Sequence, residues 1–207
     1  MDNSALFKIG YGLYVLSAKE GEKDNGCIVN TMMQVTQNPL VVVLGVNKLN
    51  YTHDMIKDTG KFNVTALAES APFDLFKQFG FQSGREADKF DGVDYAQRSE
   101  NGLLYLDKYA TAFYSCDVLE TMDFGTHTLF KAEVKDAKVL SGEESITYSY
   151  YQSHTKPKPQ AVKYTKTVWR CKICGYIYEG EELPPDFICP ICKHGAADFE
   201  KITVEAK

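Results

Sequence analysis

Four cysteines near the C-terminal end carry the clearest chemistry in this chain of 207 residues. Cys171 and Cys174 form one Cys-x2-Cys pair, and Cys189 and Cys192 form a second pair shortly after it. Two such pairs can bring four thiolates onto one ion, and the resulting tetrahedral sulfur cage suits zinc and iron alike. The spacing therefore predicts a metal site and leaves two alternatives, a structural zinc ribbon and a redox iron centre.

Composition and charge exclude several other classes of protein. The N-terminal residues lack the basic segment, apolar stretch and cleavage site of an export signal, so nothing points to an oxidising compartment in which the cysteines would form disulfides. The longest apolar run, Leu40 to Val46, is far shorter than the roughly 18 residues that span a bilayer. The net charge is -5, which does not attract nucleic acid or an anionic membrane. We therefore expect a cytoplasmic protein with neither partner, in which Cys27 and Cys116 are buried hydrophobic residues.

The residues around the four cysteines favour iron over zinc. The segments CKICGYIYEG and FICPICK, with Trp169 before them and Phe199 after them, resemble rubredoxin. The resemblance implies one iron held by Cys171, Cys174, Cys189 and Cys192, and it implies a small aromatic core around that iron. The loop between the pairs is shorter than in free-standing rubredoxins and is similar to the module fused to rubrerythrins. Lys193 occupies a position that is usually glycine in this family, so we expect the second metal-binding turn to be strained or shifted.

The N-terminal part of the chain concentrates polar side chains around turns, in Asn30–Pro39, Asn47–Asp54, Ser83–Phe90 and Gly125–Phe130. Hydroxyls, amides and cations just before a helix are typical of a phosphate site, because the N–H groups and the dipole of the helix add to the attraction. A set of turn and cap residues without a ligand would explain the same stretches. The sequence leaves both readings open at this point.

Taken together, these stretches resemble the flavin reductase-like family of FMN-binding split barrels, especially its flavoredoxin branch. The resemblance implies a mainly β fold, a Greek-key barrel that forms a homodimer with FMN near the subunit interface. It implies that His127, in a Gly-Thr-His motif, lies near the nicotinamide and the flavin as a catalytic residue; an exposed or capping histidine is the alternative. It also implies a set of FMN-binding residues along the ring, the ribityl chain and the phosphate: Asn30, Thr31, Gln34, Lys48, Asn50, Tyr51, Thr52, Arg85 and Lys89. For Arg85 and Lys89, a solvated helical face is the alternative.

Several strands and two short helices must position these residues. Strands are expected over Leu40–Leu44, Phe62–Leu67 and Ala110–Leu119. Within Thr126–Asp136 the even positions from 128 to 134 are small or apolar, which turns His127 away from the core. One helix is expected from about Thr52 to Thr59, ending at Gly60. A second is expected with Ser70 as its N-cap, with Phe73, Phe76 and Phe79 on one side and Gly80 at its end.

The chain is expected to divide into a flavin-binding split barrel over 1–154, a linker over 155–167 and a small rubredoxin-like iron domain over 168–207. The linker contains two prolines and several lysines and has no apolar periodicity.

The two modules differ in the number of electrons that they handle. A nicotinamide delivers two electrons at once and an iron in four thiolates accepts one, and a flavin can convert between them. The combination resembles the high-molecular-weight rubredoxins of anaerobic bacteria. This resemblance implies an electron carrier with an NAD(P)H-dependent reductase as donor and a flavodiiron oxygen or nitric oxide reductase as acceptor. Two alternatives remain: a flavin reductase that oxidises NAD(P)H directly, and a flavoprotein with a zinc ribbon as docking module.

Overall fold

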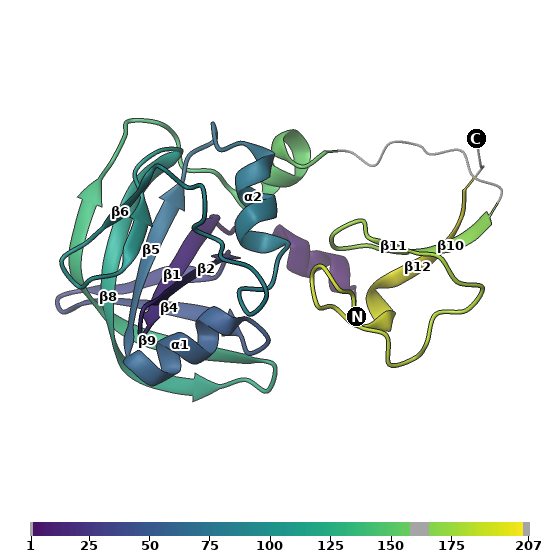
Figure 1. Cartoon of the computed structure of the whole chain (residues 1–207), viewed down its shortest axis with the longest axis horizontal. Coiled ribbons are helices and arrows are strands. Elements are labelled where there is room, and N and C mark those ends of the chain that lie inside the picture. The colour runs from purple at the N-terminus through teal and green to yellow at the C-terminus, as the bar shows by residue number, and fades with distance from the viewer. Residues whose placement is uncertain (1, 158–165, 205–207) are drawn as a thin grey trace. The chain divides into compact units, whose positions relative to one another are not determined.

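The computed structural model describes residues 2–157 and 166–204, and the chain divides into two compact units between Lys156 and Pro157 (Figure 1). Each unit is described by itself. The expected linker over 155–167 falls largely on 158–165, which lie outside the described residues.

The first unit is built on a seven-stranded sheet in the order β2-β1-β5-β8-β9-β4-β3, with antiparallel neighbours throughout. The strands are β1 (Tyr14–Glu20), β2 (Lys23–Val29), β3 (Met32–Gln37), β4 (Leu40–Asn47), β5 (Lys61–Leu67), β8 (Ala110–Asp123) and β9 (His127–Val139). A separate short pair joins β6 (Ala96–Arg98) and β7 (Leu104–Leu106).

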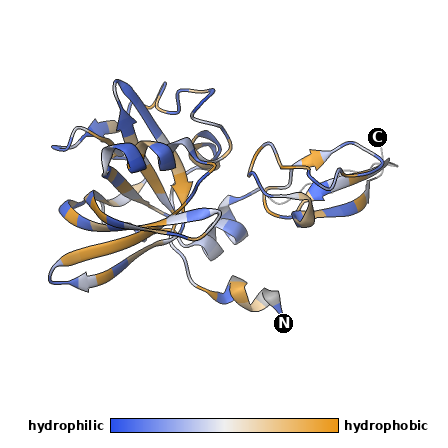
Figure 2. Ribbon diagram, turned by 90° about the horizontal axis from the view of Figure 1, so that it is seen from below, coloured by the Kyte–Doolittle hydropathy of each residue, from blue (hydrophilic) through white to orange (hydrophobic). Residues whose placement is uncertain are grey.

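The sheet must curl into a barrel because its two ends are adjacent in the chain. β2 is the first strand in the sheet order and β3 is the last, yet only Asn30 and Thr31 separate them in sequence. Figure 1 shows the resulting curvature, and Figure 2 shows hydrophobic and hydrophilic residues interleaved along the strands, as expected when one face is buried. The mainly β fold predicted from the sequence is confirmed.

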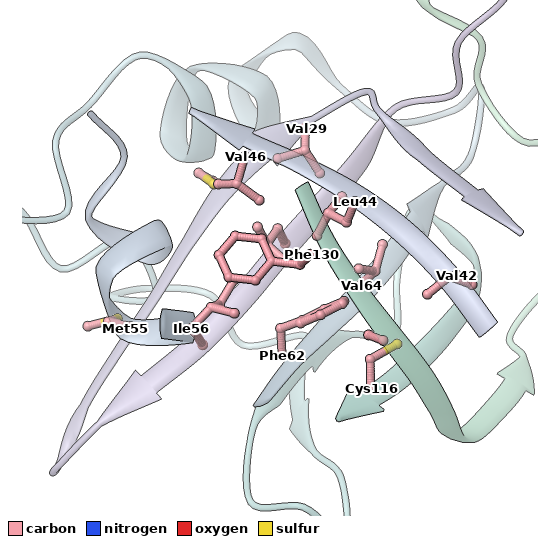
Figure 3. Close-up of a cluster of buried hydrophobic side chains, with 14 residues drawn as sticks. Val29, Val42, Leu44, Val46, Met55, Ile56, Phe62, Val64, Cys116 and Phe130 are labelled. Carbon is pink, nitrogen blue, oxygen red and sulfur yellow. The ribbon is translucent and has the colours of Figure 1, made fainter. Parts of the chain in front are cut away.

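The barrel interior is filled by aliphatic and aromatic side chains from β1, β2, β4, β5, β8 and β9 and from helix α1 (Tyr51–Thr59). Figure 3 shows Phe62 and Phe130 facing one another in this cluster, with Ile56 of α1 beside them. Cys116 is fully buried in the same cluster and Cys27 is 4% exposed, so both isolated cysteines are core residues, as expected.

A second apolar cluster packs α2 (Phe73–Gly80) through Leu75, Phe76 and Phe79. The helix is confirmed, but Ser70 is not its N-cap: the cap position is Pro72, whose side chain has no hydrogen bond to offer. Pro72 disfavours the helical conformation at Ala71, so α2 begins two residues later than a cap at Ser70 would have placed it.

The other elements agree with the sequence in type and extend beyond the expected bounds. α1 ends at Gly60, which has a left-handed φ of 70°. In β9, Thr128, Phe130 and Ala132 are buried whereas His127 and Lys131 are exposed, as the alternation predicts. β4 and β8 continue past Leu44 and Leu119 to Asn47 and Asp123.

Short helical turns complete the first unit: η1 (Asn3–Lys8), α3 (Tyr148–Tyr150) and the π-helical η2 (Tyr151–Thr155). Tyr151 of η2 is buried against Phe76 of α2, with 4.6 Å between the ring centroids.

The second unit is a three-stranded sheet in the order β11-β10-β12, formed by β10 (Lys166–Cys171), β11 (Ile177–Tyr178) and β12 (Phe199–Val204), with the 3-10 turn η3 (Ala196–Asp198) before β12. Its small core consists of cysteines, aromatic residues and a few aliphatic residues. Within the described part of the chain, no helix is long and apolar enough to cross a membrane.

Candidate functional site

The four C-terminal cysteines converge on one point of the second unit. Their Sγ atoms all lie within 4.8 Å of one another, with 3.4 Å between Cys171 and Cys192 and 3.5 Å between Cys174 and Cys189. A metal with bonds of about 2.3 Å to four sulfurs needs edges of about 3.8 Å in the sulfur tetrahedron. A disulfide would need about 2.05 Å between two sulfurs, so the arrangement fits a metal and not disulfide pairs.

Two matching turns present the four sulfurs. The Gly175 N–H donates to the Cys171 carbonyl at 2.9 Å, and the Lys193 N–H donates to the Cys189 carbonyl at the same distance. Gly175 and Lys193 both have a left-handed φ, 80° and 61° respectively. The second turn is therefore not shifted: Lys193 takes the backbone conformation of a glycine, at a steric cost that glycine would avoid.

The thiols cannot all ionise without a cation. A hydrogen bond with Cys192 is the main cause that lowers the pKa of Cys174 to about 5, and the same contact, together with burial, raises the pKa of Cys192 far above its usual range. Four thiolates in one cage therefore require a cation, and a bound metal ion supplies it.

Aromatic side chains enclose the sulfur cage. Phe187 lies 5.3 Å from Phe199 in an edge-on arrangement and 4.7 Å from Tyr178, measured between ring centroids. Trp169 and Tyr176 pack against the same cluster. An apolar shell of this kind limits the access of water, which tunes the reduction potential of an iron centre.

In the first unit, the start of α1 gathers several residues that the sequence assigns to a phosphate. Asn50 occupies the N-cap in extended conformation and its side chain makes no cap hydrogen bond. The His53 N–H donates to the Asn50 carbonyl at 2.9 Å, which leaves the N–H groups of Tyr51 and Thr52 for an outside acceptor. Lys48 precedes this helix and forms two contacts with Asp123 of β8, at 2.7 and 2.8 Å.

Cations surround Tyr51 in the first turn. The Lys23 ammonium lies 4.9 Å and the Arg85 guanidinium carbon 4.7 Å from the centre of its ring. The Tyr51 hydroxyl donates to Glu20 at 2.9 Å, and Arg85 forms an ion pair with Asp54.

Thr52 is placed differently from its neighbours, because it is fully buried. Its hydroxyl accepts a hydrogen bond from the Asn25 side chain at 2.9 Å. The side-chain oxygen of Asn25 is buried without a hydrogen-bond partner.

The residues expected along the flavin ring lie at the β3 edge of the barrel. The exposed Thr31 donates its hydroxyl to the Gly45 carbonyl of β4 at 2.6 Å. Asn30 is half-buried, and Gln34 is exposed next to a bulge in β3.

The expected catalytic residue His127 is exposed at the start of β9, directly opposite Asn47 of β4. The Lys48 N–H donates to the Thr126 carbonyl at 3.0 Å, so the Gly-Thr-His motif and the loop before α1 are adjacent. The Thr126 hydroxyl and His127 Nδ1 are 2.9 Å apart.

Unlike Arg85, Lys89 is not exposed. It is only 4% exposed, and its ammonium donates to the Phe79 carbonyl in the last turn of α2 at 2.9 Å. Burial lowers the pKa of Lys89. The structure therefore gives Lys89 a place at the end of α2, where a cation interacts favourably with the helix dipole.

Four residues at this site were not identified from the sequence: the acids Glu20, Asp54 and Asp123, and His53. His53 is buried, with Nδ1 2.9 Å from Asp54 and Nε2 2.8 Å from the Thr128 hydroxyl. It links α1 to β9 beside His127. The sequence places Asp54 next to His53, but it contains no signal that pairs Asp123 with Lys48, since 75 residues separate them.

The donors at the start of α1 match the chemistry of a flavin monophosphate. An uncapped helix N-terminus, an ammonium, a guanidinium and a phenol fit a phosphate dianion. The residues at the β3 edge offer an amide and a hydroxyl for the polar rim of a ring.

Comparison with known proteins finds a separate family match for each of the two units. Residues 6–158 match the flavin reductase-like domain, and residues 169–200 match the rubredoxin-like domain of rubrerythrin. A high molecular weight rubredoxin of Moorella thermoacetica is 37% identical, over 98% of this chain and 100% of the relative.

Two further relatives cover the first unit. A ferric-chelate reductase (NAD(P)H) of Archaeoglobus fulgidus is 37% identical over 76% of this chain and 93% of the relative. The crystal structure of flavoredoxin from Methanosarcina acetivorans is 27% identical with a TM-score of 0.57, over 63% of this chain and 69% of that chain. The chain therefore belongs to the flavin reductase-like family and carries a rubredoxin-like domain at its C-terminal end.

Proposed function

We propose that the protein is an electron carrier that takes electrons from an NAD(P)H-dependent donor and delivers them singly to an acceptor. The observation that carries this proposal is the presence, in one chain, of a four-thiolate cage and a flavin reductase-like barrel. FMN supplies two-electron acceptance with one-electron release, and iron in four thiolates supplies one-electron transfer.

The chain's own residues have distinct roles in this proposal. Lys48, Tyr51 and Arg85, with the first N–H groups of α1, bind the phosphate of FMN, and Asn30, Thr31 and Gln34 lie along its ring and ribityl chain. Thr52 has an indirect role, because its buried hydroxyl accepts a hydrogen bond from the Asn25 side chain and so fixes the position of that side chain. The four cysteines hold iron, and the aromatic residues around them exclude water.

An NAD(P)H-dependent reductase is the proposed donor, and a flavodiiron-type protein is the proposed acceptor. The similarity to the Moorella protein over both units supports the carrier role. The anaerobic visible spectrum of the native protein tests it: flavin and iron-thiolate bands should both be present, and both should bleach when the donor reductase and NAD(P)H are added. A native protein that contains zinc and lacks iron-thiolate absorption would contradict the proposal.

A second candidate function is direct oxidation of NAD(P)H by the barrel. The adjacency of His127 to Lys48 favours it, because a nicotinamide partner would then approach next to the flavin phosphate. The similarity to the ferric-chelate reductase also supports it. Mixing the protein anaerobically with NADH or NADPH alone distinguishes the two: rapid flavin bleaching indicates direct oxidation, and its absence indicates a separate donor.

We also propose that the barrel forms a homodimer. Met33 of β3 and Met122 of β8 are 62% and 57% exposed, and large apolar side chains that gather on a surface are typical of protein–protein interfaces. Light scattering after gel filtration should give twice the chain mass of 23.3 kDa. Replacing both methionines by aspartate should give the single-chain mass.

A further inference from the structure

Each side-chain donor proposed for the flavin phosphate is already held by a carboxylate. Lys48 contacts Asp123 at 2.7 and 2.8 Å, the Tyr51 hydroxyl donates to Glu20 at 2.9 Å, and Arg85 forms an ion pair with Asp54. We call Glu20, Asp54 and Asp123 the counter-carboxylates. They come from three different elements, β1, α1 and β8, so the arrangement is not the result of one acidic segment.

Two of the counter-carboxylates, Asp54 and Asp123, have pKa values lowered by their partners. The Lys48 ammonium, and then the Gly125 N–H, lower the pKa of Asp123. Burial works against ionisation of Asp54, but hydrogen bonds from His53 and Arg85 outweigh it and lower the pKa of that carboxyl as well. The donors therefore meet an incoming anion while they are already paired with negative charge.

We propose that the counter-carboxylates set the affinity for the phosphate of the flavin, by competing with it for Lys48, Tyr51 and Arg85. The inference rests on the proposed function, since it takes the start of α1 as the phosphate site. A dianionic phosphate must displace or share each of these contacts, and it is repelled by carboxylates that remain nearby. The flavin is consequently held weakly enough to dissociate and exchange.

Competition and a purely structural role predict opposite changes in the affinity for FMN when a carboxylate is neutralised. A carboxylate that merely oriented its cation would, when neutralised, weaken the binding of FMN. A competing carboxylate would, when neutralised, strengthen it. Charges a few ångströms apart at a protein surface interact strongly enough for a change of about three- to tenfold for each removed carboxylate.

The test uses the full chain with iron bound and flavin removed, and measures the Kd for FMN and for riboflavin, which lacks the phosphate. Asp123→Asn keeps an oxygen that accepts from Lys48 and Gly125, and Glu20→Gln keeps an acceptor for the Tyr51 hydroxyl. Both variants should bind FMN about three- to tenfold more tightly and riboflavin as the parent does, with the gain shrinking as salt is added.

Glu120→Gln is the matched control. Glu120 lies on the same strand as Asp123 and pairs with Lys131 at 3.2 Å, so its replacement removes the same charge outside the proposed site. This variant should leave both Kd values unchanged.

A second variant separates failure of this inference from failure of the proposed site. Lys48→Met should weaken FMN binding at least tenfold and leave riboflavin binding unchanged. If it does so while Asp123→Asn and Glu20→Gln weaken FMN binding or do not alter it, the counter-carboxylates do not compete and the inference is wrong. If Lys48→Met does not affect FMN binding, the phosphate binds elsewhere and the site and the inference are both wrong.

Discussion

The six cysteines are chemically of two kinds, as their spacing in the sequence predicts. Burial raises the pKa of Cys116 to about 12 and also raises the pKa of Cys27, so neither thiol forms appreciable thiolate near neutral pH. With iron removed under reducing conditions, we expect thiol reagents at pH 8 to modify four cysteines quickly and the other two only after denaturation. Mass spectrometry of the modified peptides gives the count. Rapid labelling of Cys116 in the folded protein would contradict this assignment.

Lys193 stores a small amount of strain at the metal site. Its φ of 61° costs a residue with a Cβ about 1 kcal/mol or more, and the greater freedom of glycine in the unfolded chain offsets part of the gain from replacing it. Lys193→Gly should therefore stabilise the iron domain by about 0.5 to 1 kcal/mol, measured as slower iron release to a chelator in urea. Lys193→Gln removes the charge but keeps the Cβ, and should not slow iron release. Equally slow release in both variants would show that charge, not strain, matters here, and release at the parent rate in both would show that neither does.

We expect Lys89 to make the free energy of unfolding of the barrel depend on pH. Its pKa is lowered by burial, so over the interval between its folded and unfolded pKa values the unfolded chain binds a proton that the folded chain does not. The free energy of unfolding should rise with pH across that interval, which lies below the usual lysine value. Denaturant titrations at pH 7 and pH 10 should show this rise in the parent relative to Lys89→Met, which lacks the titrating group. The same pH dependence in both proteins would exclude Lys89 as its source.

At the scale of elements, the loop over 83–90 passes very close to Asn25 of β2 at Gly84. A Cβ at Gly84 would lie 2.1 Å from the side-chain oxygen of Asn25, which is itself buried. Gly84→Ala should therefore destabilise the barrel by about 1 to 3 kcal/mol, as overpacked cores do, and it should weaken FMN binding because Arg85 follows directly.

A double-mutant cycle checks the cause of that effect. In the Asn25→Ala background, the clashing amide is gone and Gly84→Ala should cost much less. Gly142→Ala is the control, since a Cβ there meets nothing within 4 Å. Additive costs in the cycle would mean that Gly84 is required for another reason.

Elements specified by nearby residues could be predicted from the sequence. The end of α1 at Gly60 and the alternation along β9 depend on residues within a few positions of one another, and both are found in the structure. The four-cysteine cage could be predicted for the same reason, because two short turns, each formed by nearby residues, define it.

Features that depend on distant pairs could not be predicted. The contact between Lys48 and Asp123 requires β8, β9 and β4 to lie side by side in that order. The residues near Lys48 and those near Asp123 do not specify this order. Lys89 looked like a cation on a solvated face because it stands among acids, yet packing against α2 buries it. Ser70 was a reasonable cap by type, but the chain continues extended to Pro72 before α2 starts.

At the scale of the whole molecule, the two units differ in what holds them together. The first unit buries two apolar clusters with many large side chains, whereas the cluster of the second unit has three buried members among the described residues, two of which are the metal-binding Cys171 and Cys189. A core that small does not supply enough hydrophobic stabilisation for independent folding, so most of the stability of the second unit must come from the metal.

Removal of the metal should accordingly unfold one unit and spare the other. We expect Cys174→Ser to lose the iron-thiolate absorption and to make the peptide amides of 166–204 exchange rapidly with deuterium. The amides of β5 and β8 should remain protected, and FMN should stay bound and reducible. Cys27→Ser is the control, because it replaces a buried cysteine outside the cage and should leave the iron bands intact. Loss of FMN or of β5 protection in Cys174→Ser would mean that the barrel depends on the iron domain, and that the two units do not fold separately.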